Sequence, residues 1–263
     1  MSRRKLRVAV FKLTSCSGCQ LQILNMEDEL LTLTDAVEFT YFLEASCAAS
    51  PGPYDVAFIE GSVSTPEQEE LVKRVRGESR MLVAIGACAT AGGIQALRNW
   101  LKLGEVKKLV YPKPEWVEAL EHSKPVSEVV KVDYELRGCP VSKERLLSFI
   151  KQALLGRKPY LRRESLCMEC RRRGNVCVVV AKGLPCLGPV VQEGCGAICP
   201  YFGRGCYGCF GPSADARPEA LASRLLESGL TRGEVARLLK SFTGWSRRFR
   251  KVVEELEGGV DRG

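Results

Sequence analysis

The feature that most constrains this chain is its cysteine content. Thirteen of its 263 residues are cysteine, and only one is histidine. Disulfide frameworks are typical of small secreted domains that lack a sufficient core, whereas this chain has an ordinary apolar content and an odd number of thiols. Sites rich in thiolate and poor in imidazole suit zinc or iron–sulfur clusters. The cysteines therefore predict metal binding.

The first 150 residues alternate strand-like and helix-like segments, which predicts a mainly parallel α/β sheet. The expected strands are short runs of aliphatic and β-branched residues: Leu6–Leu13, Val37–Leu43, Tyr54–Glu60, Arg80–Ile85 and Glu128–Tyr134. The expected helices between and after them are Leu21–Leu31, Pro66–Val75, Pro114–Glu121 and Lys143–Leu155.

Four cysteines follow expected strands. Cys16 and Cys19 come after the first strand, Cys88 after the fourth and Cys139 after the last. The carboxyl ends of parallel strands meet at one edge of a sheet, where sites form in the loops. Ordinary buried cysteines are the simpler alternative, but these loop positions favour ligands. Four thiolates are the full set for one cubane cluster.

The other large group of cysteines lies in the second half of the chain. Eight fall between residues 167 and 209, among many glycines and prolines, so little regular structure is expected there. Taken alone, this run fits zinc and iron–sulfur sites about equally well. Together with the first four it makes three sets of four, and Cys47, expected to be a small buried apolar residue, is left over. The eight are Cys167, Cys170, Cys177, Cys186, Cys195, Cys199, Cys206 and Cys209.

These patterns divide the chain into three regions. Residues 1–158 are expected to form the sheet domain, residues 159–212 a two-cluster domain, and residues 213–263 a helical extension. In the extension, amphipathic helices are predicted at Glu219–Ser228, Thr231–Phe242 and Trp245–Glu257. The basic residues between 245 and 251 are interpreted as a solvated helix face.

Charge and hydropathy exclude several functions. The net charge is +8, but the arginines are scattered, so nucleic-acid binding is not indicated. No apolar stretch approaches the roughly 18 to 20 residues that span a bilayer. Arg3-Arg4 resembles the start of a twin-arginine signal, yet the apolar run that follows ends at Phe11, and cleavage beyond it would remove Cys16 and Cys19. A cytoplasmic protein is therefore expected.

The motifs around the cysteines resemble the small, electron-transferring subunit of nickel–iron hydrogenases. Within that family the chain is most similar to the cytoplasmic group that contains sulfhydrogenase delta subunits and methyl-viologen-reducing hydrogenase small subunits. The resemblance rests on Ser15-Cys16-Ser17-Gly18-Cys19, Glu60-Gly61-Ser62, Gly86-Ala87-Cys88-Ala89, Cys186-Leu187-Gly188-Pro189, Gly194-Cys195-Gly196-Ala197, Cys199-Pro200 and Gly205-Cys206-Tyr207-Gly208-Cys209.

The resemblance implies a flavodoxin-like domain, a loop-rich cluster domain with C-terminal helices, and three clusters in a row. This chain differs from periplasmic relatives at two ligand positions: Cys167 stands where they have a histidine, and Cys199 stands where they often have a proline. Both differences favour three [4Fe–4S] clusters. The implied ligands are Cys16, Cys19, Cys88 and Cys139 for the proximal cluster, Cys195, Cys199, Cys206 and Cys209 for the medial one, and Cys167, Cys170, Cys177 and Cys186 for the distal one.

The resemblance also implies a partner, because the nickel–iron site belongs to a large subunit that binds it through two Cys-x2-Cys pairs. Cys206 and Cys209 are superficially similar to one such pair, but Tyr207 stands where glycine is required, so both are assigned to a cluster. The expected function is electron relay between that subunit and a soluble acceptor or another flavin or iron–sulfur subunit. No residue of this chain is expected to perform acid–base chemistry.

Three points stay open at this level. Glu60 either faces the partner or is a structural carboxylate, and His122 is expected in an exposed loop. The chain carries no dinucleotide fingerprint, so NAD(P), a deazaflavin, polysulfide or a disulfide reductase would be reached through other subunits. The alternatives to a hydrogenase subunit are the iron–sulfur subunit of a complex-I-like respiratory oxidoreductase and a structural zinc protein.

Overall fold

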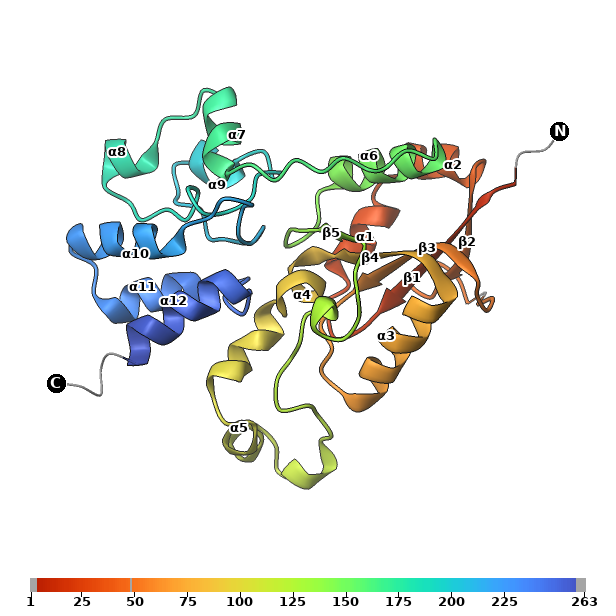
Figure 1. Cartoon of the computed structure of the whole chain (residues 1–263), viewed down its shortest axis with the longest axis horizontal. Helices are drawn as coiled ribbons and strands as arrows, with labels where there is room; N and C mark the ends of the chain where they lie inside the picture. The colour runs from red at the N-terminus through yellow and green to blue at the C-terminus, as the bar shows by residue number, and fades with distance from the viewer. Residues whose placement is uncertain (1–3, 48, 259–263) are drawn as a thin grey trace. The chain divides into compact units, whose positions relative to one another are not determined.

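A parallel sheet of five strands forms the centre of the first of two units, residues 1–161 and 162–263 (Figure 1). The structure is a computed structural model that describes residues 4–47 and 49–258, so Arg3 lies outside the described residues. The strand order β2-β1-β3-β4-β5 is the flavodoxin-like order, which confirms the expected fold of this unit. The strands are β1 Leu6–Lys12, β2 Val37–Phe42, β3 Tyr54–Glu60, β4 Ser79–Ile85 and β5 Tyr134–Leu136.

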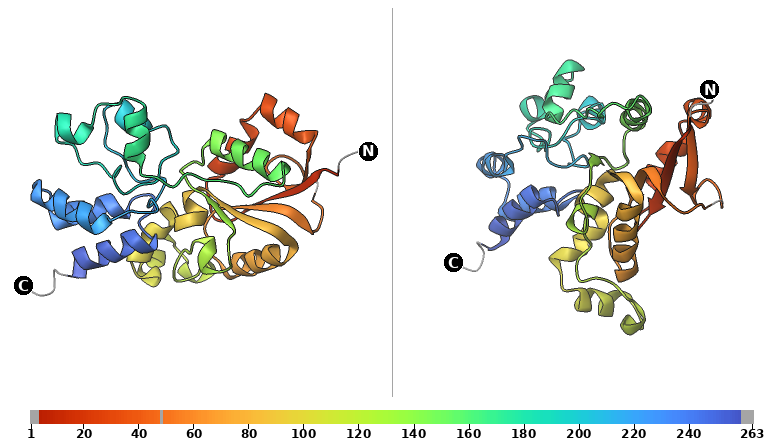
Figure 2. Two further views of the ribbon diagram at one scale, coloured as in Figure 1. Left: turned by 45° about the horizontal axis from the view of Figure 1, so that its top comes forward. Right: turned by 45° about the vertical axis from the view of Figure 1, so that its right-hand side comes forward.

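Helices cover both faces of this sheet, which explains why its strands are continuously apolar (Figures 1 and 2). Ile23, Phe149 and Ile150 pack with Val8 and Val10 on one face, while Val72 and Val75 pack with the opposite face. Helices α1 Gly18–Leu24, α2 Asp28–Thr34 and α6 Lys143–Leu154 lie on the first face, and α3 Pro66–Glu78 and α4 Gly86–Ala91 lie on the second.

The remaining elements of this unit are short. A 3-10 helix, η1 Ile94–Trp100, and helix α5 Leu103–Val110 follow α4. Two further 3-10 turns are η2 Pro114–Trp116 and η3 Val126–Glu128.

Three of the expected elements are wrong in extent. The helix expected over Leu21–Leu31 is two helices, because Glu27 has a φ of 47° and interrupts the turn. The helix expected over Pro114–Glu121 is only the turn η2. The strand expected over Glu128–Tyr134 begins at Tyr134, because the valines before it fill the core from a loop and pair with no strand.

The second unit carries its regular structure mainly at its C-terminal end. In the cysteine run the helices are brief: α7 Leu166–Arg172, α8 Val178–Lys182 and α9 Ile198–Tyr201. Three longer helices follow and pack on one another through Val235, Leu239, Phe249 and Val253 (Figure 2). They are α10 Pro218–Glu227, α11 Arg232–Lys240 and α12 Arg247–Gly258, close to the predicted ranges.

These helices are joined to the cysteine run by specific contacts. The buried Thr243 Oγ1 donates to the Gly208 carbonyl at 2.8 Å, and the Arg248 guanidinium donates to the Ala216 carbonyl at 2.9 Å. The expected division at residue 212 stays a prediction. Over the described ranges, no helix is both long and apolar enough to cross a bilayer.

Candidate metal centres

The first four cysteines meet at the carboxyl edge of the sheet. Burial raises the pKa of the Cys19 thiol, and the nearby Cys88 and Cys139 raise it further. Burial also raises the pKa of Cys88 to about 11, with added contributions from Cys139 and Cys16. Cys88 and Cys139 therefore lie within electrostatic reach of both Cys16 and Cys19. The structure brings together the four residues that the loop positions predicted.

Two glycines leave room for these sulfurs. Gly86 has a φ of +84°, and a Cβ there would overlap Cys19 Sγ. Gly93 has a φ of +63°, and a Cβ there would lie 2.5 Å from Cys88 Sγ. Residues with a Cβ rarely adopt a positive φ, and at these two positions the Cβ would also displace a thiol. The segments that carry Cys19 and Cys88 therefore approach their neighbours as closely as they do only because these positions are glycine.

A buried carboxylate anchors the loop that carries Cys16 and Cys19. Glu60, at the end of β3, is 2% exposed. Its carboxylate accepts hydrogen bonds from the Cys19 backbone N–H at 3.0 Å, Gln20 Nε2 at 2.7 Å and Ser15 Oγ at 3.2 Å. Of the two roles left open by the sequence, the structural one is therefore observed. Burial contributes most to the raised pKa values of Cys19, Cys88 and Cys139, and the negative charge of Glu60 adds a smaller contribution to each.

Backbone amides complete this first set. The Val141 N–H donates to Cys19 Sγ at 3.4 Å, and the Ala87 N–H donates to the Gly138 carbonyl at 2.7 Å. The second bond joins helix α4, which carries Cys88, to the loop that carries Cys139. Cys88 was expected in a loop, but it lies in this short helix directly after β4. Hydrogen bonds from backbone N–H groups to cysteine sulfur are one of the levers that tune iron–sulfur sites. The donor chemistry of this edge therefore fits a cluster.

In the second unit the cysteines form two groups. Burial raises the pKa of Cys167 to about 11, and the nearby Cys186, Cys170 and Cys177 make smaller contributions to the same rise. These four are one set expected from the sequence. Burial likewise raises the pKa of Cys206, and the nearby Cys209 and Cys195 add to that rise. Burial also raises the pKa of Cys199, followed in effect by the nearby Cys186, while Cys199 in turn contributes to the raised pKa of Cys195.

Cys186 stands between these two groups. Its sulfur accepts hydrogen bonds from the Cys206 N–H at 3.2 Å and the Gly188 N–H at 3.4 Å. The Leu187 N–H donates in return to the Cys206 carbonyl at 3.1 Å. A Cβ on Gly205 would overlap the Pro185 carbonyl oxygen, so the two segments touch backbone to backbone. The sequence does not reveal this junction, because it joins residues 20 apart without any local pattern.

The raised pKa values restrict what these thiols can do. A buried thiol with a raised pKa is protonated at neutral pH and is a poor nucleophile. Thiolate ligands must lose their protons when a metal binds, and the bound cation drives that loss. The seven thiols with a raised pKa are therefore suited to holding metal and poorly suited to acting as nucleophiles. Within residues 4–47 and 49–258, no three Cys, His, Asp or Glu side chains converge closely enough to hold a single metal ion.

Comparison with known proteins identifies the family. Residues 16–153 match the family described as NADH ubiquinone oxidoreductase, 20 kDa subunit. Over 240 residues the chain is 37% identical to the sulfhydrogenase 2 subunit delta of Pyrococcus furiosus, an alignment that covers 91% of this chain and 100% of that protein. The chain belongs to this family of hydrogenase subunits.

Two further comparisons support this family assignment. A subunit of the F420-non-reducing hydrogenase vhu of Methanocaldococcus jannaschii is 32% identical over 234 residues, covering 78% of this chain and 81% of that protein. A solved NAD+-reducing [NiFe]-hydrogenase matches with a TM-score of 0.56 and 34% identity over 60% of this chain and 96% of that chain. The resemblance inferred from the motifs is confirmed, and the protein is a subunit of oxidoreductase type.

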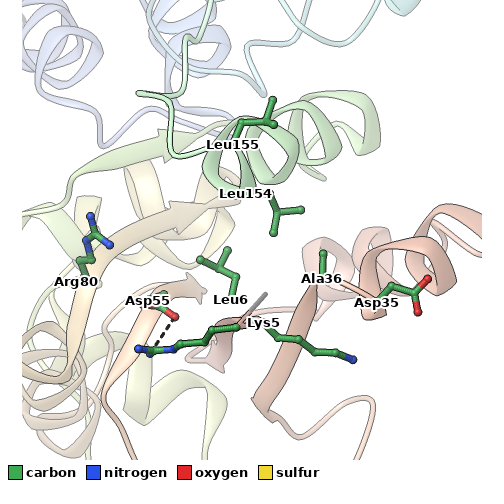
Figure 3. A pocket seen from close by; sticks show the side chains of 9 residues that line it. Lys5, Leu6, Asp35, Ala36, Asp55, Arg80, Leu154 and Leu155 are labelled. Carbon is green, nitrogen blue, oxygen red and sulfur yellow. Dashed lines mark ion pairs between the residues drawn. The ribbon is translucent and has the colours of Figure 1, made fainter. Parts of the chain in front are cut away.

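Other predicted residues lie away from the three sets. His122 is exposed, as expected. Cys47, expected to be buried, is exposed, because it follows β2 in an open turn and not in the core. A cavity of about 400 Å³ lies at the opposite, amino-terminal edge of the sheet (Figure 3). Arg4 and Asp55, which both line it, form an ion pair at 3.5 Å. No cysteine lines it, so it is separate from the metal-binding chemistry.

Proposed function

We propose that this chain is the electron-transfer small subunit of a cytoplasmic [NiFe] hydrogenase and carries three [4Fe–4S] clusters. The proposal is supported by two findings: the chain belongs to a hydrogenase subunit family, and its sequence carries the twelve cysteines from which three ligand sets of four are predicted. The proximal set is Cys16, Cys19, Cys88 and Cys139, the medial set Cys195, Cys199, Cys206 and Cys209, and the distal set Cys167, Cys170, Cys177 and Cys186.

The residues of the chain position ligands and shape the electrostatics around them. Clusters held there would supply one-electron carriers, so the chain itself needs no acid or base. Glu60 holds the loop of the proximal set, and Cys186 links the distal and medial sets through the Cys206 N–H. All-thiolate ligation keeps negative charge at each site, which favours low reduction potentials.

The partner in this proposal is the [NiFe] large subunit. Support comes from relatives whose names describe hydrogenase subunits, and from the structural match to a NAD+-reducing [NiFe]-hydrogenase. Electron transfer requires close approach, and permanent hetero-complexes bury about 2,000 Å² or more. Further flavin or iron–sulfur subunits would carry electrons between this chain and the final acceptor.

The respiratory alternative shares only part of this support. The family match at residues 16–153 covers the sheet unit, which a complex-I-like subunit also contains. The eight cysteines between residues 167 and 209 lie beyond it and favour the hydrogenase. The structural zinc alternative is distinguished by its absorption spectrum, because a zinc protein is colourless whereas iron–sulfur clusters absorb broadly near roughly 400 nm.

The decisive experiment is anaerobic purification followed by metal analysis and mass spectrometry. We expect about 12 irons per chain and co-purification with a nickel-containing subunit. Cys19→Ser should lose about four irons, since it removes one ligand of one cubane, while Cys47→Ser should keep the full iron content. A preparation with about 8 irons, or mainly zinc, would refute the assignment. So would a cluster-complete chain that is monodisperse and alone in its native extract.

A further inference from the structure

The cysteines of the second unit differ in their access to solvent. All eight are among the described residues, and only Cys177 is exposed. Cys177 precedes the first turn of α8. The neighbouring Val176 is 71% exposed and Val180 is 87% exposed. The most accessible edge of the two cysteine sets is therefore surrounded by exposed apolar side chains.

A surface cavity adjoins this edge. It has a volume of about 440 Å³ and lies between the segment that carries Cys177 and the turn after α9. Phe202, 71% exposed, and Tyr201, 60% exposed, form its other wall. Exposed aromatic and aliphatic side chains around a concavity are characteristic of protein interaction sites.

The rim of this cavity is positively charged. Between residues 162 and 209 there are seven Arg or Lys and three Glu residues. Lys182 lines the cavity, and the Arg173 guanidinium lies 5.2 Å from the centre of the Tyr201 ring. Lys182 Nζ is also 3.5 Å from the Gly203 carbonyl oxygen, so the cation is held at the rim.

The three glutamates do not neutralise this rim. Glu193 is buried and pairs with Arg172, which also pairs with Glu164 at 3.0 Å. Glu169 accepts a hydrogen bond from the Gly194 N–H at 2.9 Å. The acids are thus engaged within the fold, while Arg173, Lys182 and the exposed Arg204 present their charge to solvent. A partner with a carboxylate-rich face would be complementary.

We propose that the surface formed by Val176, Val180, Lys182, Tyr201 and Phe202 docks an electron-transfer protein whose own contact face is acidic. The proposal rests on the proposed function, because it makes Cys177 the edge through which electrons pass to or from that protein. The partner places an apolar group in the cavity and carboxylates against the cationic rim. Electron transfer at this edge requires contact there, and charge complementarity brings the partner to it.

The test begins with the hydrogenase complex purified anaerobically from its native extract. A carbodiimide joins a lysine amine to a carboxylate only when the two are in contact. We expect Lys182 to be coupled to an Asp or Glu of an iron–sulfur or flavin protein, either resident in the complex or added back from the extract. Lys251 on α12, with 69% of its side chain exposed, is the matched control and should not couple to that protein. Coupling of Lys182 to the nickel-containing subunit, to a second copy of this chain or to nothing would overturn the proposal.

Variants then test the electron transfer itself. Val180→Glu and Lys182→Glu should lower hydrogen-driven reduction of the coupled protein about tenfold. Methyl viologen reduction should stay within about twofold, because a small dye does not require this surface. Lys251→Glu makes the same charge change elsewhere and should leave both rates intact. Unchanged reduction of the coupled protein in both surface variants contradicts the docking site.

Two further outcomes distinguish this proposal from a lipid-binding surface and from failure of the proposed function. An anionic membrane would also be attracted to a cationic apolar surface, so phosphatidylglycerol vesicles are tested in parallel. Vesicle binding by the complex that is lost in Lys182→Glu would replace the protein partner with a lipid surface and overturn the proposal. A wild-type complex without hydrogen-dependent viologen reduction would remove the proposed function, and the docking proposal with it.

Discussion

The two units hold cysteines in different ways. In residues 1–161 four of the thiols lie at the carboxyl edge of a parallel sheet with a core on both faces, and two of them, Cys19 and Cys88, belong to the short helices α1 and α4. In residues 162–263 eight thiols lie in a run whose helices span only four to seven residues. There a backbone hydrogen bond to sulfur, from the Cys206 N–H to Cys186 Sγ, joins two segments of the run to each other. The sheet positions the thiols of the first unit, whereas the cysteine run of the second unit depends on the metal that its thiols would bind.

This difference has an energetic consequence. A hydrophobic core stabilises the first unit whether or not metal is bound. Metal-binding free energy becomes folding free energy where a site does not exist without its metal. We therefore expect the two units to respond differently to loss of iron.

The largest effect is expected on iron removal from the full chain by an anaerobic chelator. Amide hydrogen exchange should become fast across residues 163–212, while β1, β3 and β4 stay protected. The C-terminal helices should lose protection in part, because Thr243 is tied to the Gly208 carbonyl. Mass spectrometry of the exchanged peptides gives the result. Equal loss of protection in both units would show that the sheet also depends on its metal, and the distinction between the two units would fail.

The next effect concerns glycines that let backbone and sulfur approach. Gly86→Ala should disturb only the proximal set, at a cost of about four irons, because its Cβ overlaps Cys19 Sγ. Gly205→Ala should cost up to about eight irons, because it pushes apart the segments that carry Cys186 and Cys206.

Each unit offers a matched control for these two changes. An alanine Cβ at Gly104 in α5 meets nothing within 4 Å, and at Gly233 in α11 it lies 3.5 Å from Arg237 Nη1. Both control variants should keep their iron, measured anaerobically against protein mass. If Gly205→Ala loses no more iron than Gly86→Ala, the junction at Cys186 does not join the two sets.

A smaller effect concerns the charge behind the proximal set. Glu60 is buried, and the donors to it are the neutral Ser15, Gln20 and Cys19 N–H. Glu60→Gln keeps the shape and removes one negative charge, so the proximal cluster should become easier to reduce by on the order of 50 mV. Clusters of the second unit should shift less in the same titration, followed by electron paramagnetic resonance.

The control for this change is a carboxylate at the same edge. Glu44 accepts a hydrogen bond from Ser17 Oγ but pairs with Lys12 and has a side chain 32% exposed, so solvent screens it. Glu44→Gln should therefore leave the proximal potential nearly unchanged. A shift as large as that of Glu60→Gln would show that position in the loop, and not burial, determines the effect.

The sequence predicted the sheet of the first unit better than its irregular parts. Strands β1 to β4 were found within one or two residues, because short apolar runs rich in β-branched residues favour buried parallel strands over helices. The fifth strand was misplaced, since Val129, Val130 and Val132 lie in a loop that packs on the core and are partly buried there. Helices α7, α8 and α9 are too short for a periodic pattern to indicate them.

The site shows the same contrast. The first four cysteines could be expected at one edge of the sheet because each follows a predicted strand, whereas the grouping of the other eight is implied by the family resemblance and stays a prediction. The role of Glu60, the junction at Cys186 and the exposure of Cys47 could not. Each depends on which residues distant in sequence become neighbours, and no local pattern encodes that.

The smallest expected effect tests whether sheet register positions the loop of Cys139. Asp133 precedes β5, and its carboxylate accepts hydrogen bonds from the Leu82 N–H at 2.8 Å and Arg76 Nη1 at 2.6 Å. Burial acts to raise the pKa of Asp133, but these two bonds outweigh it and the pKa is lowered. The ionised carboxylate therefore stabilises the folded state at neutral pH, and this contribution is lost as the pH falls below about 4 and through the folded-state pKa.

Asp133→Asn should accordingly destabilise the β4–β5 pairing by about 1 kcal/mol at pH 7, since the ion pair with Arg76 is partly exposed. Amide exchange at Leu82 should then accelerate about fivefold, and the difference from the wild type should shrink as the pH falls below about 4 and through the lowered folded-state pKa of Asp133. Iron in the second unit should be unaffected, because its loops do not rely on this strand. An equal loss of protection around Cys167 and Cys206 would mean that the two units share one cooperative transition, which is the result that would most directly contradict separate modes of holding cysteine.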